Sequence, residues 1–467
     1  MRVRILMEIV GDDGSPCHVE ELAVLNKQLE RAEDIGLTLS ESKALLGSLQ
    51  QRLVTVQAEQ WFGSQRQCRD CGRQRRIKGS YPIVFHTLFG DVRLASRRLF
   101  CCRCRGGQAE KSSSPLAQLL PDHVAPERLY LETRWSSLVS YAAAAELLSD
   151  VLPVTAGANA STTRRHVLRV AKRIETELPE ACSSLVEGNL SDLPLPGGRM
   201  FVGLDGGYLR DWSEKKSNFE VIVGRSIPQA PEDGTSRYLG FVHGYDQNPK
   251  RRLVSMLESQ GVQANQDITF LTDGGEEICA LTERISPCSE HVLDWFHIAM
   301  RLTVLNQYAK GVAQYDEETG ASLIEVLARI KWKLWHGNTI EARETIEDLE
   351  ADVSCLDTGY PNEGKFFTAM REFAVYIASN AASLVNYGER YRSGERISSA
   401  FVEATVNAVV SKRFAKKQQM QWTRRGAHLL LQTRTRTLDG TLRSTFQRWY
   451  PNMSNGNAPF ASNAIAA

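Results

Sequence analysis

The sequence predicts a multidomain protein of the α+β class, and three observations carry that prediction. The chain of 467 residues is longer than one hydrophobic core usually serves, so about two to four structural units are expected. Two Cys-x-x-Cys pairs flank segments with strand-like alternation in the first quarter of the chain. After residue 198, helical periodicity gives way to short apolar runs of strand length.

The composition is that of a folded protein in water. Hydrophobic residues make up 42% and charged residues 24% of the chain, and no apolar run approaches the about eighteen residues of a membrane span. Residues 1–10 carry Glu8 inside an apolar stretch and lack a small-residue cleavage site, which argues against a secretory signal. We therefore expect a cytoplasmic protein with no membrane partner.

Residues 1–62 are predicted to form a helical region. Leu, Glu, Gln and Lys recur at helical spacing between residues 18 and 60. Thr38-Leu-Ser-Glu41 has the pattern of a capping box, which begins a helix by satisfying its free backbone N–H groups. The expectation for this region is a pair of helices, the second of which begins after Thr38.

Residues 63–124 are predicted to form a zinc-ribbon-like module. Cys68-Arg-Asp-Cys71 and Cys101-Cys-Arg-Cys104 each place two thiols on one turn, and a hairpin between them would bring the pairs together. A pair of disulfides is the alternative, which a cytoplasmic location disfavours. Because four thiolates close the coordination shell, one structural Zn²⁺ held this way supports folding and not catalysis. The expected ligands are Cys68, Cys71, Cys101 and Cys104, with Cys102 left over.

Residues 125–192 are predicted to form a helical DNA-binding domain. A helix ending near Leu152-Pro153 is followed by a Gly/Asn turn and then by a basic amphipathic segment, for which Ser161 is the natural N-cap. The pattern resembles a helix-turn-helix, and a solvated helix surface is the alternative explanation. The DNA-contacting candidates on the exposed side are Arg164, Arg165, Arg169, Lys172 and Arg173.

Residues 199–300 are predicted to form the first part of an α/β core, after a Pro/Gly-containing connector at residues 193–198. A helix is expected around residues 250–259. Three closely spaced strands, this helix and a fourth strand follow the order expected of an RNase H-like core. The four apolar runs of strand length lie at residues 200–204, 219–223, 238–242 and 268–271.

Two aspartates end apolar strands in the same way, because both Asp205 and Asp273 follow an apolar run and precede two glycines. A strand end holds a side chain rigidly, and the glycines let a nucleic-acid backbone approach closely. Hard cations such as Mg²⁺ take oxygen ligands, and a two-metal site needs carboxylates from separate elements. Glu403, in a helix predicted over residues 398–415, is the expected third carboxylate, and Glu395 is its competitor.

Residues 301–392 are predicted to be helical, and residues 393–450 to hold the final helix and a basic C-terminal segment. No acidic residue occurs from Ala404 to Leu438, a distribution that favours phosphate contact over a solvated helix face. Residues 451–467 have too little apolar content to pack and are expected to be disordered. The DNA-contacting candidates in the basic segment are Lys412, Arg413, Lys416, Lys417, Arg424 and Arg425.

The order of Asp205, Asp273, an Asp294-Trp-Phe-His297 element, a long helical stretch and Glu403 resembles the DDE transposases of the Mutator-like group. Within that group, the chain resembles the ISKra-type bacterial insertion-sequence transposases. The resemblance implies an RNase H-like core interrupted by an α-helical insertion at residues 301–392. It also implies that Asp205, Asp273 and Glu403 bind two catalytic Mg²⁺ or Mn²⁺ ions. Asp294 and His297 would then position the active site, unless their role is a structural hydrogen bond.

The chemistry implied is hydrolysis of a phosphodiester at the element end, followed by attack of the freed 3′-hydroxyl on target DNA. The expected partners are double-stranded DNA, at transposon ends and at the target, and further copies of the chain in a homodimer or higher oligomer. The alternatives are an RNase H-like nuclease without strand transfer and a non-enzymatic zinc and helix-turn-helix regulator. Trp332 and Trp335 either stack on exposed DNA bases or belong to the core.

Overall fold

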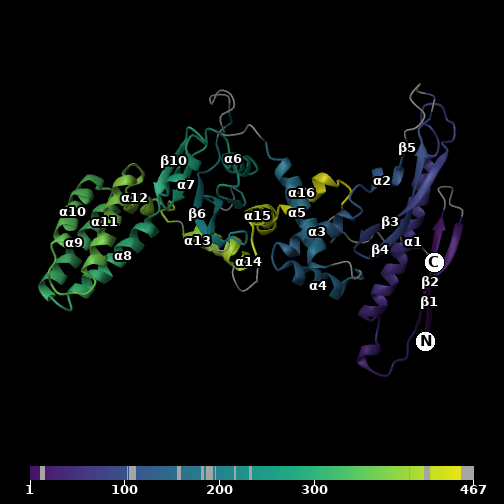
Figure 1. Cartoon of the computed structure of the whole chain (residues 1–467), viewed down its shortest axis with the longest axis horizontal. Helices are drawn as coiled ribbons and strands as arrows, with labels where there is room; N and C mark the ends of the chain where they lie inside the picture. The colour runs from purple at the N-terminus through teal and green to yellow at the C-terminus, as the bar shows by residue number, and fades with distance from the viewer. Residues whose placement is uncertain are drawn as a thin grey trace. The chain divides into compact units, whose positions relative to one another are not determined.

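The computed structural model divides into two compact units, one of Met1–Val170 with Thr441–Ala467 and one of Ala171–Gly440. Both contain helices and strands, so the predicted mixed α+β class is confirmed (Figure 1). Within the described residues, every helix is either too short or too polar to cross a membrane. The structure describes residues 1–10, 16–102, 104, 112–154, 159–179, 184–185, 193–194, 196–214, 217–230, 234–398, 400–414 and 421–453.

The N-terminal region begins with strands and not with the predicted pair of helices. β1 (Arg2–Val10) and β2 (Pro16–Asn26) are antiparallel, and only the second predicted element is a helix, α1 (Leu39–Gln65). Exposure alternates along β1 with a period of two, because successive side chains of a strand point to opposite faces. The capping box is confirmed: Glu41 N–H donates to the Thr38 hydroxyl at 3.2 Å, and Thr38 N–H donates to the Glu41 carboxylate at 2.8 Å.

The predicted hairpin between the cysteine pairs is confirmed. β3 (Ile77–Thr87) and β4 (Gly90–Phe100) are antiparallel, and the short β5 (Ser112–Ser113) pairs with β4. Gly90 allows the tight turn between β3 and β4, because its φ of 116° is one that residues with side chains rarely adopt. Helices α1 and α2 (Pro115–Leu119) pack on this ribbon. The buried residues of the small core there are Ile83, Val92, Leu94 and Leu116.

Three helices follow the ribbon, α3 (Pro126–Ser136), α4 (Tyr141–Val151) and α5 (Ala160–Thr176). α5 is capped by Asn159 and not by Ser161, because the Asn159 side chain accepts a hydrogen bond from the Thr162 backbone at 2.9 Å. Ser161 instead lies in the first turn of the helix. Asn is as good a capping residue as Ser, so the rule that predicted the helix start was right and the residue was wrong.

Buried charges hold α3 and the beginning of α5 together. The Glu132 carboxylate accepts a hydrogen bond from Arg128 at 3.0 Å and lies 2.6 Å from His166 Nδ1. All three side chains are almost completely buried, and burial of any one of them without its partners would be costly. In the same unit, α16 (Leu442–Trp449) packs on α3 through an edge-to-face contact between Phe446 and Tyr130.

The second unit is built on a five-stranded sheet with the strand order β10-β9-β6-β7-β8. Strand β7 is antiparallel to both β6 and β8, whereas β9 is parallel to both β6 and β10. The four predicted strands are confirmed, and β10 was missed because three of the five residues in Ser-Glu-His-Val-Leu are polar. The strands are β6 (Met200–Arg210), β7 (Asn218–Pro228), β8 (Arg237–Val242), β9 (Ile268–Thr272) and β10 (Ser289–Leu293).

Helices pack on this sheet. α6 (Lys250–Glu258), where the sequence predicted a helix, and α7 (Glu276–Thr282) contribute Leu253 and Ile278 to a core shared with the strands. α15 (Arg424–Leu438) lies on β8. The predicted last helix is present as α13 (Ala400–Val406), which continues into a π-helical turn, η6 (Asn407–Ser411), and then into α14 (Lys412–Phe414).

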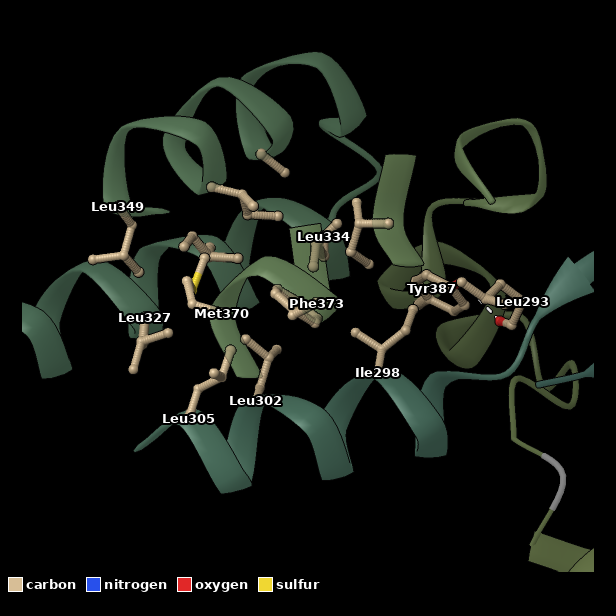
Figure 2. Packing of buried hydrophobic residues seen from close by; sticks show 14 of the residues in the cluster. Leu293, Ile298, Leu302, Leu305, Leu327, Leu334, Leu349, Met370, Phe373 and Tyr387 are labelled. Carbon is tan, nitrogen blue, oxygen red and sulfur yellow. Dashed lines mark hydrogen bonds between the residues drawn. The ribbon is translucent and has the colours of Figure 1, made fainter. Parts of the chain in front are cut away.

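The predicted helical region between β10 and α13 forms a four-helix bundle. Helix α8 contacts α9 and α11, and α10 contacts the same two helices. Figure 2 shows that Leu302, Leu327 and Phe373 point into the shared interior. The bundle is joined to the sheet by α12 (Tyr387–Arg392), where the Tyr387 hydroxyl donates to the Leu293 carbonyl at 2.8 Å. The four helices are α8 (Trp295–Val312), α9 (Glu317–Trp335), α10 (Thr339–Ser354) and α11 (Glu363–Ser379).

Candidate functional site

Asp205 and Asp273 occupy matching positions on neighbouring parallel strands. The register of β6 and β9 pairs Gly203 with Leu271, and each aspartate lies two residues further along its strand direction. Both side chains are half-buried. Asp205 accepts a hydrogen bond from the Gly206 backbone at 2.7 Å, and Asp273 accepts one from the Gly275 backbone at 3.0 Å. The two Asp-Gly-Gly segments therefore hold two carboxylates next to each other at one end of the sheet.

Glu403 is brought to the same face of the sheet by α13. Val402 is buried, and a Cβ added to Gly203 would stand 1.9 Å from Val402 Cγ2, so the helix lies directly on β6. Side chains two residues apart in a strand share a face, which places Asp205 on the face that α13 covers. The Glu403 side chain itself is exposed. The close packing of α13, which carries Glu403, on β6 therefore requires a glycine at position 203.

The three carboxylates interact electrostatically. Burial raises the pKa of the Asp205 carboxyl, and the negative charges of Asp273 and Glu403 raise it further. The Gly206 N–H group and the charge on His297 act in the opposite direction. A carboxylate whose charge is disfavoured by burial and by two like charges is stabilised by a bound cation.

Asp294 and His297 lie at the beginning of α8, next to these carboxylates. Asp294 is fully buried and caps the helix by accepting a hydrogen bond from the Phe296 backbone at 2.8 Å. Its other oxygen lies 3.5 Å from His297 Nε2. Asp294 therefore fixes the start of α8, and His297 is close enough to Asp205 for its charge to lower the Asp205 pKa.

Glu395, the competitor of Glu403, lies in a different charged cluster. Its carboxylate is 2.7 Å from Arg199 and 3.3 Å from Arg390. Arg390 also pairs with Glu290 on β10 at 2.7 Å. Two arginines already neutralise Glu395, so it fastens the end of the bundle to the sheet.

Four thiols of the first unit are grouped closely enough to hold a metal ion. Cys68 Sγ lies 3.6 Å from Cys104 Sγ, and Cys71 Sγ lies 3.3 Å from Cys102 Sγ. These separations exclude S–S bonds of about 2.05 Å. The first pair lies on a turn closed by a 2.9 Å hydrogen bond from Gly72 N–H to the Cys68 carbonyl.

The structure corrects one of the predicted thiol ligands, because Cys102 and not Cys101 belongs to the cluster. Cys101 is exposed and directly follows β4, which ends at Phe100. The Sγ atoms of Cys102 and Cys104 lie within 4.8 Å of those of Cys68 and Cys71, and Cys101 is not part of this group. The Cys-x-x-Cys spacing had favoured Cys101.

The thiols differ in acidity. Backbone N–H groups at Asp70 and Cys71 lower the pKa of Cys68 to about 7. Hydrogen bonds with Cys102 and Cys68 raise the pKa of Cys104 to about 12. Without a cation the four groups share protons, and thiolates are the form that binds metal.

The basic side chains predicted on α5 are only partly available. Arg164 and Arg165 are exposed, as are Lys172 and Arg173. Arg169, by contrast, pairs with Asp122 at 2.6 Å. Arg164 and Arg165 thus retain the exposure that a contact with DNA requires.

The structure corrects part of the predicted C-terminal basic surface. Arg413 is fully buried, with its guanidinium carbon 5.4 Å from the centre of the Trp422 ring, so it packs inside the protein and cannot meet DNA. The buried Arg434 donates to the Val409 carbonyl of η6 at 2.6 Å, and burial lowers its pKa to about 10. The remaining candidates differ in placement: Lys412, Arg424 and Arg425 are exposed, and Lys416 and Lys417 lie outside the described residues.

Two cavities of the second unit adjoin these groups. One of about 510 Å³ is lined in part by Lys172, Arg251 and Arg425. The other, of about 640 Å³, is lined in part by Asp273 and by Arg424, which pairs with Asp211 at 3.2 Å. Basic and acidic residues from distant parts of the sequence therefore meet in two separate hollows.

A cluster of Glu220, His243 and Glu277 in the second cavity was not predicted. Its ligand atoms lie within 4.8 Å of one another. A charged residue in an otherwise apolar strand run, Phe219-Glu-Val-Ile-Val, is the one sequence signal that pointed to it. His243 and Glu277 follow other elements, so no local spacing connects them.

The insertion tryptophans differ from each other. Trp332 is 58% exposed. Trp335 packs against Trp295 with ring centroids 4.9 Å apart, which is the arrangement of a core residue. Of the two, Trp332 alone has the exposure that base stacking requires.

Comparison with known proteins assigns no family. The chain matches no protein-family model and no curated protein.

Proposed function

We propose that the chain is a DDE-type DNA transposase, which binds element ends and catalyses metal-dependent cleavage and strand transfer. The observation that carries this proposal is the placement of Asp205, Asp273 and Glu403 on one face of the sheet, with electrostatic coupling between Asp205 and the other two. Phosphoryl transfer by two metal ions needs carboxylates that converge from separate elements, as these do.

The strand arrangement supports an RNase H-like core. One sheet contains three consecutive antiparallel strands and a fourth strand that is parallel to the first. A helix lies between the third and the fourth strand in sequence, which is the order expected from the sequence. The four-helix bundle interrupts this core between β10 and α13, where the resemblance implied an insertion. The proposal therefore accounts for both the sheet and the bundle.

The donor set fits hard divalent cations. Three carboxylates supply oxygen ligands, and their mutual repulsion favours Mg²⁺ or Mn²⁺ over an empty site. Such ions activate a water or hydroxyl nucleophile and stabilise the leaving oxygen when bound. The residues of the chain would hold and orient these ions. Backbone N–H groups fix the Asp205 and Asp273 carboxylates. Asp294 fixes the beginning of α8 and thereby the position of His297.

Exposed cations support a DNA partner. Arg164 and Arg165 on α5 are proposed to contact element-end DNA, and Lys172, Arg251 and Arg425 line one cavity suited to a phosphate. The thiol cluster is proposed to hold one structural Zn²⁺, which favours sulfur ligands in a closed shell of four. A homodimer or higher oligomer that pairs two element ends belongs to the same proposal.

The test is a cleavage and strand-transfer assay on DNA that carries the flanking ends of the element, with Mg²⁺ or Mn²⁺. Asp205→Ala and Asp273→Ala are expected to abolish cleavage while binding to end DNA persists or tightens, because negative charge beside the DNA is removed. Loss of binding in folded Asp205→Ala protein would contradict the proposal.

A matched pair of variants tests the third carboxylate. Glu403→Gln is expected to abolish cleavage, whereas Glu395→Gln is expected to retain it, because Glu395 pairs with Arg199 and Arg390. The reverse result would transfer the assignment to Glu395. Cleavage without joining to target DNA would favour a nuclease, and binding without cleavage under all metal conditions would favour a regulator.

A further inference from the structure

Glu220, His243 and Glu277 come from three different elements that surround one cavity. Glu220 lies on β7, His243 directly follows β8, and Glu277 lies in the first turn of α7. His243 Nε2 is 2.8 Å from the Glu277 carboxylate, and His243 Nδ1 is 3.5 Å from the Glu220 carboxylate. The cavity of about 640 Å³ that they line is large enough for an ion with its water ligands.

The backbone makes room for one of these carboxylates. A Cβ added to Gly206 would stand 2.5 Å from Glu220 Oε1, so the absent side chain at position 206 is what lets Glu220 lie across β6. Glu220 is 23% exposed at its side chain, which is low for a carboxylate whose ion-pair partner among the described residues is a histidine. The sheet therefore holds Glu220 in place toward His243.

The surroundings of the cluster are strongly negative. Burial raises the pKa of Glu220; the charge of His243 opposes this, and the charges of Glu277 and Asp273 add to it. The charge of Glu220 in turn raises the pKa of the Tyr208 hydroxyl. Glu276 lines the same cavity, and among the described residues of its lining Arg424 is the one basic residue besides His243. Excess negative charge around an imidazole favours a bound cation.

We propose that Glu220, His243 and Glu277 form a divalent-cation site of their own, beside the carboxylates of Asp205, Asp273 and Glu403. One imidazole nitrogen and two carboxylates suit a transition metal such as Mn²⁺ or Zn²⁺ better than Mg²⁺, because Mg²⁺ prefers oxygen ligands only. The site does not depend on the proposed transposase reaction, since none of its three ligands belongs to the proposed catalytic set.

Mn²⁺ binding to the full-length protein tests this site, with equilibrium dialysis and electron spin-echo spectroscopy as readouts. The combined variant Asp205→Ala, Asp273→Ala, Glu403→Ala removes the other oxygen ligands and is expected to keep one bound Mn²⁺ per chain. Its spectrum should show coupling to an imidazole nitrogen, and an excess of Mg²⁺ should not displace the ion. Adding His243→Ala or Glu277→Gln to that variant should abolish binding.

His336→Ala, at the end of α9 in the bundle, is the matched control and should leave Mn²⁺ binding unchanged. Circular dichroism verifies that each variant is folded. The proposal is overturned if the triple carboxylate variant is folded and binds no Mn²⁺, or if its Mn²⁺ survives His243→Ala. If the triple carboxylate variant loses cleavage but keeps this Mn²⁺, the metal site is supported independently of the proposed catalytic function.

Discussion

The carboxylates of the sheet and the thiols of the first unit are two candidate metal-ligand sets that the chain assembles in opposite ways. Cys68 and Cys71 share one turn, and all four thiols lie near the end of one hairpin, largely at the surface. Asp205, Asp273 and Glu403 belong to three elements far apart in sequence, and two of them are half-buried. Local spacing therefore specifies the thiols, whereas the carboxylates depend on sheet register and helix packing.

The largest effect is expected at the thiol cluster. Cys102→Ser should remove the proposed stoichiometric Zn²⁺ and unfold the turn around it, because the free energy of metal binding is then no longer available for folding. Cys101→Ser should keep the metal and the stability. Metal analysis and thermal unfolding of both variants measure this difference. Equal metal content in the two variants would restore Cys101 as a ligand.

The next effect is expected where α13 meets the sheet. Gly203→Ala places a Cβ 1.9 Å from Val402 Cγ2, so α13 must move or the strand must shift. We expect a loss of about 1–3 kcal/mol in the free energy of unfolding, the usual result of overpacking, together with reduced cleavage although all three carboxylates remain.

Gly364→Ala in α11 is the matched control, because nothing lies within 4 Å of the added Cβ. It should not destabilise the protein, since Ala favours a helix more than Gly does. Chemical denaturation and the cleavage assay measure both variants. If Gly203→Ala were as stable and active as wild type, α13 would not be held by this contact.

A smaller and opposite effect is expected for Asp205→Asn without divalent metal. Folding raises the pKa of Asp205 above its value in the unfolded chain. The ionised carboxylate therefore destabilises the folded protein once the pH rises through the folded-state pKa. At pH values below the unfolded-state pKa, the carboxyl is protonated in both states and the destabilisation is absent. The variant should therefore melt at a higher temperature than wild type near pH 7. The advantage should disappear in acid and when Mg²⁺ is added to wild type.

The smallest effect concerns thiol reactivity in the metal-free protein. With a pKa of about 7, Cys68 is half ionised at neutral pH, whereas a pKa of about 12 keeps Cys104 protonated. Iodoacetamide at pH 7 should therefore alkylate Cys68 before Cys104, as mass spectrometry of timed samples can show. Equal rates would mean that the hydrogen bonds around the cluster do not persist in solution.

The same comparison explains what the sequence could predict. The hairpin between the cysteines, the four strands of the core and the helical region before α13 follow from periodicity and turn residues. The N-terminal strands were missed because Leu and Glu at residues 20–25 suit a helix as well as a strand, although alternation and the Gly-Asp-Asp-Gly run at residues 11–14 favour a hairpin.

The remaining differences arise from packing that no local pattern encodes. Arg413 belongs to a run of basic residues in sequence, but it is buried against Trp422, so charge density alone could not place it. The Cys-x-x-Cys spacing favours Cys101, yet Cys102 is the residue that lies with the other three thiols. Glu220, His243 and Glu277 meet only because β7, β8 and α7 surround one cavity.

The separation of Glu403 from the aspartates also orders events during synthesis. Asp205 lies in β6 and Asp273 directly follows β9, and residue 403 follows residue 273 by 130 positions. At about 5–20 residues per second, the ribosome needs roughly 7 to 26 seconds to translate that interval. A nascent chain thus contains Asp205 and Asp273 long before Glu403 is made, because the residues of the bundle are translated in between. A product terminated within the bundle retains the basic face of α5 but lacks α13 altogether, so premature termination would turn the proposed transposase into a DNA-binding competitor of the complete protein.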